Sequence, residues 1–198
     1  MKNGKPISLI MLIFAVALFS SYHIYNYCLY KFNNKIVDKY IEIESAKKNY
    51  PLDIVDKKED AKEEFLGVLE IPKINLKKGF YNITSINNNV NKNIQILTNS
   101  QMPDIPNSTM IIAAHSGNSY LGYFKKLNQL LIGDQISIYY HNKKYTYVIS
   151  SSYETLKNGE LTIIKNTNEK VLVLTTCSKN NNQQLVVMSK LLKEENLL

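Results

Sequence analysis

From residue 65 onward the sequence breaks into short runs rich in Val, Ile, Leu and aromatic residues, separated by Asn, Gly and Pro. These runs are "FLGVLEIP", "KKGFYNI", "MIIAA", "KVLVLTTC" and "QLVVMSKLL". β-Branched and aromatic residues favour strands, and Pro72 ends the first run because proline cannot donate to a strand ladder. In "DQISIYYHNKKYTYVISSSYE", Ile136 and Ile138 alternate with polar neighbours and "HNKK" supplies a turn, which predicts a hairpin. Many short strands predict a mostly-β barrel or sandwich.

One or two short helices should accompany these strands. In "SYLGYFKKLNQLL" the apolar residues Tyr120, Phe124, Leu127 and Leu131 recur at helical spacing. We therefore expect a short amphipathic helix over this stretch.

The segment "ISLIMLIFAVALFSSYHIYNYCLY" at residues 7–30 contains no Asp, Glu, Lys or Arg. About 20 residues of helix cross the hydrocarbon core of a bilayer, and tyrosines at one end suit the membrane interface. We predict a single-pass transmembrane anchor with the following domain outside the cell. The alternative is a cleaved signal peptide ending at "AVA", residues 15–17. The anchor is favoured because hydrophobic and interfacial residues continue beyond that site.

Residues 31–64 have a different character. "NNKIVDKYIEIESAKK" predicts an amphipathic helix that Pro51 interrupts, and a charged connector follows. The chain therefore divides into a cytoplasmic tip and membrane anchor at 1–30, a charged helical stalk at 31–64 and an extracellular domain at 65–198.

The net charge of +7 is carried by lysine alone, because the sequence contains no arginine. The lysines are scattered and no nucleic-acid-binding motif is present, so we expect no nucleic-acid partner. The acidic residues of the domain do not cluster as calcium ligands would. They include Asp104, Asp134, Glu154 and Glu160. We expect neither a metal nor a cofactor.

Cys177 ends a buried apolar run and precedes a polar loop, so its thiol should lie at a rim. The other cysteine, Cys28, lies in the apolar N-terminal segment, which makes a disulfide a poor explanation. An unpaired thiol in an exported domain is at risk of oxidation, and a role as a nucleophile would explain why it is present. His115 likewise follows the apolar run "MIIAA" and is a candidate partner, whereas His141 lies in a predicted turn and His23 in the anchor. A core cysteine and a capped loop histidine are the ordinary alternatives.

The residues around both positions resemble those of the sortases. "LVLTTCS" is similar to the strand that carries the sortase nucleophile, and "MIIAAHSGN" to the segment with its histidine. "FKKLNQLLIGDQISIYY" and "GVLEIPKINLKKGFY" also resemble sortase segments. The resemblance extends over residues 65 to about 192 and looks least like class B.

This resemblance implies an eight-stranded β-barrel and a membrane-anchored cysteine transpeptidase. Such an enzyme cleaves secreted proteins at a C-terminal sorting signal of Leu-Pro-x-Thr-Gly type. It holds them as a thioester and transfers them to an amine of a cell-wall precursor or a pilin. By this carry-over Cys177 is the nucleophile and His115 the general acid and base, while Thr176, Ser116 and Gln183 contact the substrate.

One departure concerns the arginine that sortases carry on the last strand, where this chain has Gln184. An amide can donate hydrogen bonds but lacks a fixed charge, so a penalty of ~1–3 kcal/mol in the transition state is expected. Lys179 or Gln183 could compensate. Two alternatives therefore stay open: a degenerate sortase-like domain that binds peptide without turnover, and a cysteine peptidase that hydrolyses the same signal.

Overall fold

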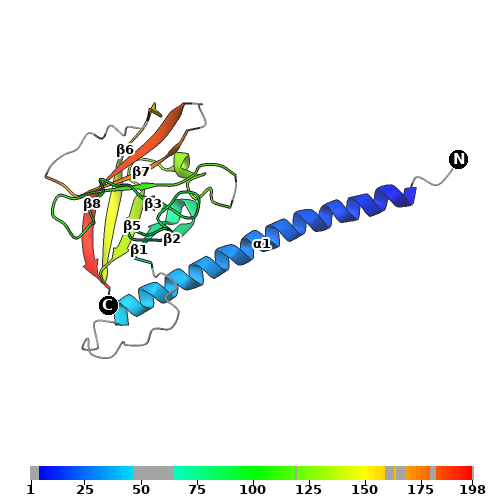
Figure 1. Ribbon diagram of the computed structural model, residues 1–198, viewed down its shortest axis with the longest axis horizontal. Helices are drawn as coiled ribbons and strands as arrows, with labels where there is room; N and C mark the ends of the chain where they lie inside the picture. Colours follow the sequence, from blue (N-terminus) through cyan, green and yellow to red (C-terminus); the bar gives the residue numbers. More distant parts are fainter. Residues whose placement is uncertain are drawn as a thin grey trace. The chain divides into compact units, whose positions relative to one another are not determined.

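The computed structural model describes residues 5–46, 65–118, 120–158, 163, 168–178 and 182–197. Within these residues eight strands form one sheet in the order β2-β1-β5-β6-β8-β7-β4-β3, which curls into a nearly closed barrel (Figure 1). The strands are β1 (Gly67–Ile71), β2 (Leu76–Phe80), β3 (Gln95–Ile96), β4 (Thr109–Ala113), β5 (Gln135–Tyr140), β6 (Lys143–Leu156), β7 (Val171–Cys177) and β8 (Gln183–Asn196). The predicted mostly-β, eight-stranded barrel is confirmed.

The predicted hairpin is β5 and β6, which pair antiparallel from Tyr140↔Lys143 onward. Its two turn residues, His141 and Asn142, both adopt left-handed backbone angles, with φ of 47° and 58°. A two-residue turn with positive φ at both positions matches the right-handed twist of the flanking strands. The turn therefore fixes the register of β5 against β6 at that end of the barrel.

The stretch at 120–131 does not form the predicted amphipathic helix. It contains turns and one short 3-10 helix, η3 (Leu127–Gln129), and a second such helix, η2 (Pro72–Ile74), follows β1. The amide of Phe124 donates to the carbonyl of His115, outside the stretch, instead of to a residue one helical turn earlier. Phe124 and Leu127 are buried whereas Leu131 is exposed, so the apolar stripe is divided between core and solvent.

The N-terminal helix α1 (Lys5–Ala46) has 42 residues, and its residues up to Ile36 belong to a different compact unit from the rest of the chain. Large apolar side chains between Leu9 and Tyr27 are exposed. Among the described residues, no helix has both the length and the apolar character needed to cross a bilayer, so the predicted transmembrane helix is not supported.

The end of α1, from Val37 onward, belongs to the same unit as the barrel. Val37 is buried, and the Tyr40 hydroxyl donates to the carbonyl of Leu66 at 2.8 Å. Asp38 forms an ion pair with Lys77 of β2. The rest of the predicted stalk, residues 47–64, lies outside the described residues.

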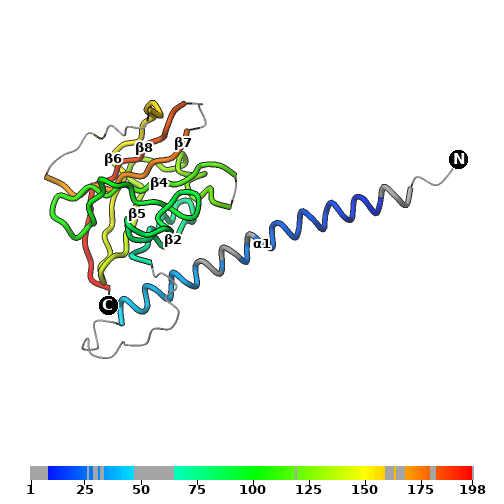
Figure 2. Tube along the Cα trace, viewed as in Figure 1, coloured from blue at the N-terminus to red at the C-terminus, as the bar shows by residue number. Residues whose placement is uncertain are grey.

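The sheet has apolar side chains on both faces. Side chains alternate between the two faces along each strand. Leu172 and Leu174 of β7 face the barrel core, whereas Val171 and Val173 belong to a smaller cluster with Val186 of β8. The traces of β4, β7, β8 and β6 run next to one another across the barrel wall in this pairing order (Figure 2). The smaller cluster therefore covers the second face of these four strands.

Lys78 of β2 is buried, and its ammonium lies 4.7 Å from the centre of the Tyr123 ring. Burial lowers the pKa of Lys78 to about 8, because removing a charged amine from water disfavours the charged form. The folded protein therefore releases this proton at a lower pH than the unfolded chain does.

This difference predicts how stability depends on pH. Between pH 8 and 10 the unfolded chain binds more protons at Lys78, so this residue alone should add about 2 kcal/mol to the free energy of unfolding. From about pH 9 upward the raised pKa values of buried tyrosines such as Tyr139 and Tyr147 act in the opposite direction, so the contribution of Lys78 is read as a difference from a variant that lacks it. In urea unfolding curves the free energy of unfolding of the wild type should gain about 2 kcal/mol over that of Lys78→Met between pH 8 and 10. Lys77→Met, which changes the half-buried neighbour paired with Asp38, should keep a nearly constant difference from the wild type over this range. A constant difference for Lys78→Met would contradict this assignment.

Candidate functional site

Four strands end at one edge of the barrel. Strands β4 and β7 are parallel, with Ala113 opposite Thr175, so both run toward this edge. Strand β8 is antiparallel to β7 and begins here at Gln183, and β6 is antiparallel to β8 and ends here at Leu156. The edge therefore collects the carboxyl ends of β4, β6 and β7 and the amino end of β8.

The pairing brings two of the predicted residues, Cys177 and Gln184, onto one face. Cys177 lies directly opposite Gln184, and paired residues of neighbouring strands project from the same side of a sheet. His115 is two residues beyond Ala113, as Cys177 is two residues beyond Thr175. A continuation of the same register past the end of β4 would set His115 opposite Cys177. The thiol is half-buried, and the amide of Gln184 donates to the carbonyl of Leu156 at 3.5 Å.

A side-chain hydrogen bond joins β4 and β7 one residue before this pair. The buried hydroxyl of Thr176 donates to the carbonyl of Ala114 at 2.6 Å, and the amide of Ala114 donates to Thr175 at 3.3 Å. These bonds continue the pairing past the last residue of β4. Thr176, which we predicted to contact substrate, thus holds together the strands that carry His115 and Cys177.

The orientation of the imidazole is set by the Asn-rich loop before β3. The Nε2 atom of His115 lies 3.0 Å from the side-chain oxygen of Asn91. In the tautomer with the proton on Nε2, the side-chain oxygen of Asn91 accepts this hydrogen bond and Nδ1 is left to exchange protons. Asn91 was not identified from the sequence, because nothing distinguishes it from the other asparagines around it.

A cleft of about 110 Å³ opens beside the thiol. Predicted residues Ser116 and Thr176 line it together with Cys177, and Glu154 of β6 lies in the same wall. The carboxylate of Glu154 accepts a hydrogen bond from Ser178 at 2.5 Å. Gln183, the remaining predicted residue, is not among the lining residues and alternates with Gln184, so its side chain projects from the opposite face.

A lysine that sequence reasoning missed contacts the sulfur. The ammonium of Lys157, just beyond β6, lies 3.4 Å from Sγ of Cys177. Its relevance depends on how β6 registers against β8, which no local sequence signal reveals. Lys179, the lysine that we considered for this purpose, lies outside the described residues.

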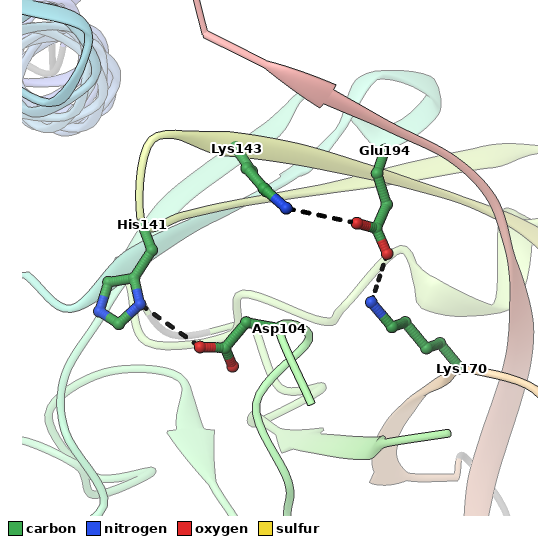
Figure 3. Close-up of polar contacts among 5 residues, drawn as sticks. All are labelled: Asp104, His141, Lys143, Lys170 and Glu194. Atoms are coloured by element: carbon green, nitrogen blue, oxygen red, sulfur yellow. Dashed lines mark hydrogen bonds and ion pairs between the residues drawn. The ribbon is translucent and has the colours of Figure 1, made fainter. Parts of the chain in front are cut away.

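The other histidine of the domain, His141, belongs to a separate polar cluster, shown in Figure 3. His141 lies 3.5 Å from the carboxylate of Asp104, and Glu194 forms ion pairs with Lys143 and Lys170. Lys170 precedes β7, so the strand separates it from Cys177 by about 20 Å. His141 is the turn histidine that the sequence predicts. Among the described residues no group of three His, Cys, Asp or Glu side chains could hold a metal.

Comparison with known proteins places most of the chain in one family. Residues 69–192 match the family model described as the Sortase domain. This match includes both the His115 segment and the Cys177 strand. No curated protein matches the sequence.

Solved structures share the fold at low sequence identity. Sortase C of Streptococcus pneumoniae has 19% identity and a TM-score of 0.62, over 82% of this chain and 97% of that chain. Sortase D5 of Clostridium perfringens has 21% identity and a TM-score of 0.59, over 80% and 99%. Sortase A of Listeria monocytogenes has 19% identity and a TM-score of 0.58, over 68% and 91%.

The hydrogen bond between β4 and β7 makes a prediction about stability. Thr176→Val preserves the shape of the side chain but removes the donor, which leaves the buried carbonyl of Ala114 with a lost partner. The free energy of unfolding should fall by about 1–3 kcal/mol. Thr176→Ser, which keeps the hydroxyl, should lose less than half as much. Equal stability of the Val variant and the wild type in urea unfolding would show that this bond does not hold the strands together.

Proposed function

The chain belongs to the sortase family, whose members are cysteine transpeptidases, and on this premise we propose that it transfers proteins from a C-terminal sorting signal to an amine. The signal is of Leu-Pro-x-Thr-Gly type, cleaved between Thr and Gly. The acceptor is an amine of a cell-wall precursor or of a pilin. Residues 65–198 form the catalytic domain.

One observation carries this proposal. The parallel register of β4 and β7 ends at Ala113↔Thr175, two residues before His115 and Cys177, and we infer that it continues to this pair, so that the imidazole lies beside the half-buried thiol at one edge of the barrel. A thiol nucleophile needs a base or cation nearby and a group that protonates its leaving group. The arrangement supplies both from adjacent strands.

The first half of the reaction forms a thioester. The sulfur of Cys177, as thiolate, adds to the carbonyl carbon of the signal's Thr, and the carbonyl oxygen becomes an oxyanion. His115, as imidazolium, then gives its proton to the Gly nitrogen. The C–N bond breaks, the oxyanion reforms a carbonyl, and the leaving amine departs neutral.

The second half transfers the acyl group. Neutral His115 removes a proton from the acceptor amine as its nitrogen attacks the thioester carbon. The C–S bond breaks and Cys177 leaves as thiolate, which restores the starting thiolate and imidazolium. Asn91 keeps the imidazole in one orientation throughout, because its side-chain oxygen binds Nε2 in both protonation states.

Gln184 is in position to act on the oxyanion. It projects from the same face as Cys177 and lies directly opposite it, and its amide nitrogen can donate hydrogen bonds. The bond from this nitrogen to the Leu156 carbonyl is long, at 3.5 Å. Gln184 serves as a neutral donor where sortases typically have arginine.

The absence of arginine also supports a second candidate, a sortase-like domain that binds peptide without turnover. Hydrolysis by water in place of an amine is the remaining alternative. The three activities differ in their products, so one reaction mixture separates them.

We also propose that the catalytic domain lies on the outer side of the cell membrane and is held there by residues 7–30. This segment lacks charged residues and ends in tyrosines, and its exposed apolar side chains favour a lipid environment. Secreted proteins carrying a sorting signal would reach the domain in that location.

The activity is tested with the full chain, a peptide carrying the sorting signal and an added amine. We expect a thioester on Cys177 in the intact mass, its release by hydroxylamine, and a peptide–amine product. Cys177→Ala should abolish all three, and His115→Ala should lower kcat/KM by at least about 1,000-fold. Formation of the free acid alone, despite added amine, would identify a hydrolase. Peptide binding without any thioester would identify the non-catalytic domain.

Attachment is tested in cells that express the full chain. The protein should sediment with membranes, resist extraction by salt, and be degraded by protease added outside the cells. A variant lacking residues 7–30 should appear in the soluble fraction. Full-length protein that is soluble, or that is protected from external protease, would refute the proposed location.

A further inference from the structure

The contact between Lys157 and Cys177 has a fixed structural basis. The amide of Lys157 donates to the carbonyl of Asn182 at 2.9 Å, which extends the β6–β8 pairing one residue beyond Leu156↔Gln183. The backbone of Lys157 is therefore anchored beside the start of β8, the strand that pairs with Cys177 through Gln184.

The alternation of side chains along β6 also directs the side chain of Lys157 to the face of the sheet that carries Cys177. Thr155 is opposite Gln184, which is opposite Cys177, so these three share a face. Lys157 is two residues beyond Thr155 and projects from that same face. Its ammonium reaches to 3.4 Å from the sulfur.

We propose that Lys157 is a catalytic residue that supplies the positive charge at the reacting sulfur. This inference rests on the proposed transpeptidase function and deepens it. The sequence has no arginine, and the ammonium of Lys157 is the cation that the described structure places against Sγ. The charge comes from the end of β6, whereas Gln184 of β8 contributes a neutral amide.

The chemistry of an ammonium suits both charged states of the reaction. Before attack, one N–H donates to the thiolate, and charge-assisted hydrogen bonds are about twice as strong as neutral ones. As the C–S bond forms, the negative charge moves from sulfur to the adjacent carbonyl oxygen. An ammonium has three donors on one atom, so it can follow the charge while staying protonated. No proton leaves Lys157 in either half of the reaction.

Other charges near the cleft are arranged differently. Glu154 lies three residues before Lys157, so it projects from the opposite face, and its carboxylate accepts a hydrogen bond from Ser178. Lys125 also lines the cleft and is exposed. It offers a control: a lysine in the wall of the cleft beside Cys177, whereas Lys157 contacts the sulfur without being one of the residues that line this cleft.

The first test needs no turnover. In full-length protein with Cys28→Ser, Cys177 is alkylated with iodoacetate, which is anionic, and with iodoacetamide, which is neutral. A cation at the sulfur favours the anionic reagent, so the ratio of the two rates should fall about 3- to 10-fold in Lys157→Gln at low salt. Lys157→Arg and Lys125→Gln should keep most of the wild-type ratio, and added salt should narrow the difference.

The second test measures transpeptidation. Lys157→Gln should lower kcat/KM by about 10- to 100-fold, mainly through kcat, because the charge acts on the transition state. Lys157→Arg should recover most of the rate. An unchanged alkylation ratio in Lys157→Gln, or equal loss of rate in the Arg and Gln variants, would overturn the role of the charge. Likewise, a stable amide between the substrate and Lys157 would make it an acceptor instead.

The two tests separate this inference from the function on which it rests. If the wild type turns over no peptide while the alkylation ratio still depends on Lys157, the transpeptidase proposal fails and the charge contact stands. If the wild type is active and the ratio does not depend on Lys157, the function stands and the charge contact fails.

Discussion

The parallel pairing of β4 with β7 is the constraint on which the site depends. Parallel strands carry their carboxyl ends to the same edge of a sheet, which antiparallel neighbours cannot do. Ala113 is opposite Thr175, and the hydroxyl of Thr176 extends the contact to Ala114. Two residues beyond the last pair come His115, just past β4, and Cys177, the last residue of β7. We therefore attribute their expected proximity to the backbone register that leads up to them.

The two faces of these strands have different roles: one packs in the barrel core and the other carries the candidate site. Residues that face inward, such as Leu174, pack in the barrel core and fix the register, because a slip by one residue would expose them. On the other face, the residues in the first part of β7, such as Val173, form an apolar cluster. Toward the end of the strand this face becomes polar around Cys177. One strand can therefore stabilise the barrel and present a nucleophile at its rim.

Local sequence patterns predicted much of the barrel and the two residues Cys177 and His115, but not the residues that surround them in the site. The hairpin at His141 follows from alternation and a turn that tolerates positive φ, and Cys177 and His115 stand out because each ends an apolar run. The helix predicted at 120–131 forms only over η3, and the amide of Phe124 donates to His115 outside the stretch. Lys157 was missed because its position depends on pairing between strands distant in sequence.

The most direct test of this account is a disulfide that reports the register itself. In a Cys28→Ser background, His115→Cys places a second thiol beside Cys177, and mild oxidation of the folded protein should join the two with loss of both free thiols. Ala113→Cys, on the same face but opposite Thr175, should stay unlinked. Free thiols in folded His115→Cys, or equal cross-linking of both variants, would contradict the placement of the histidine beside the cysteine.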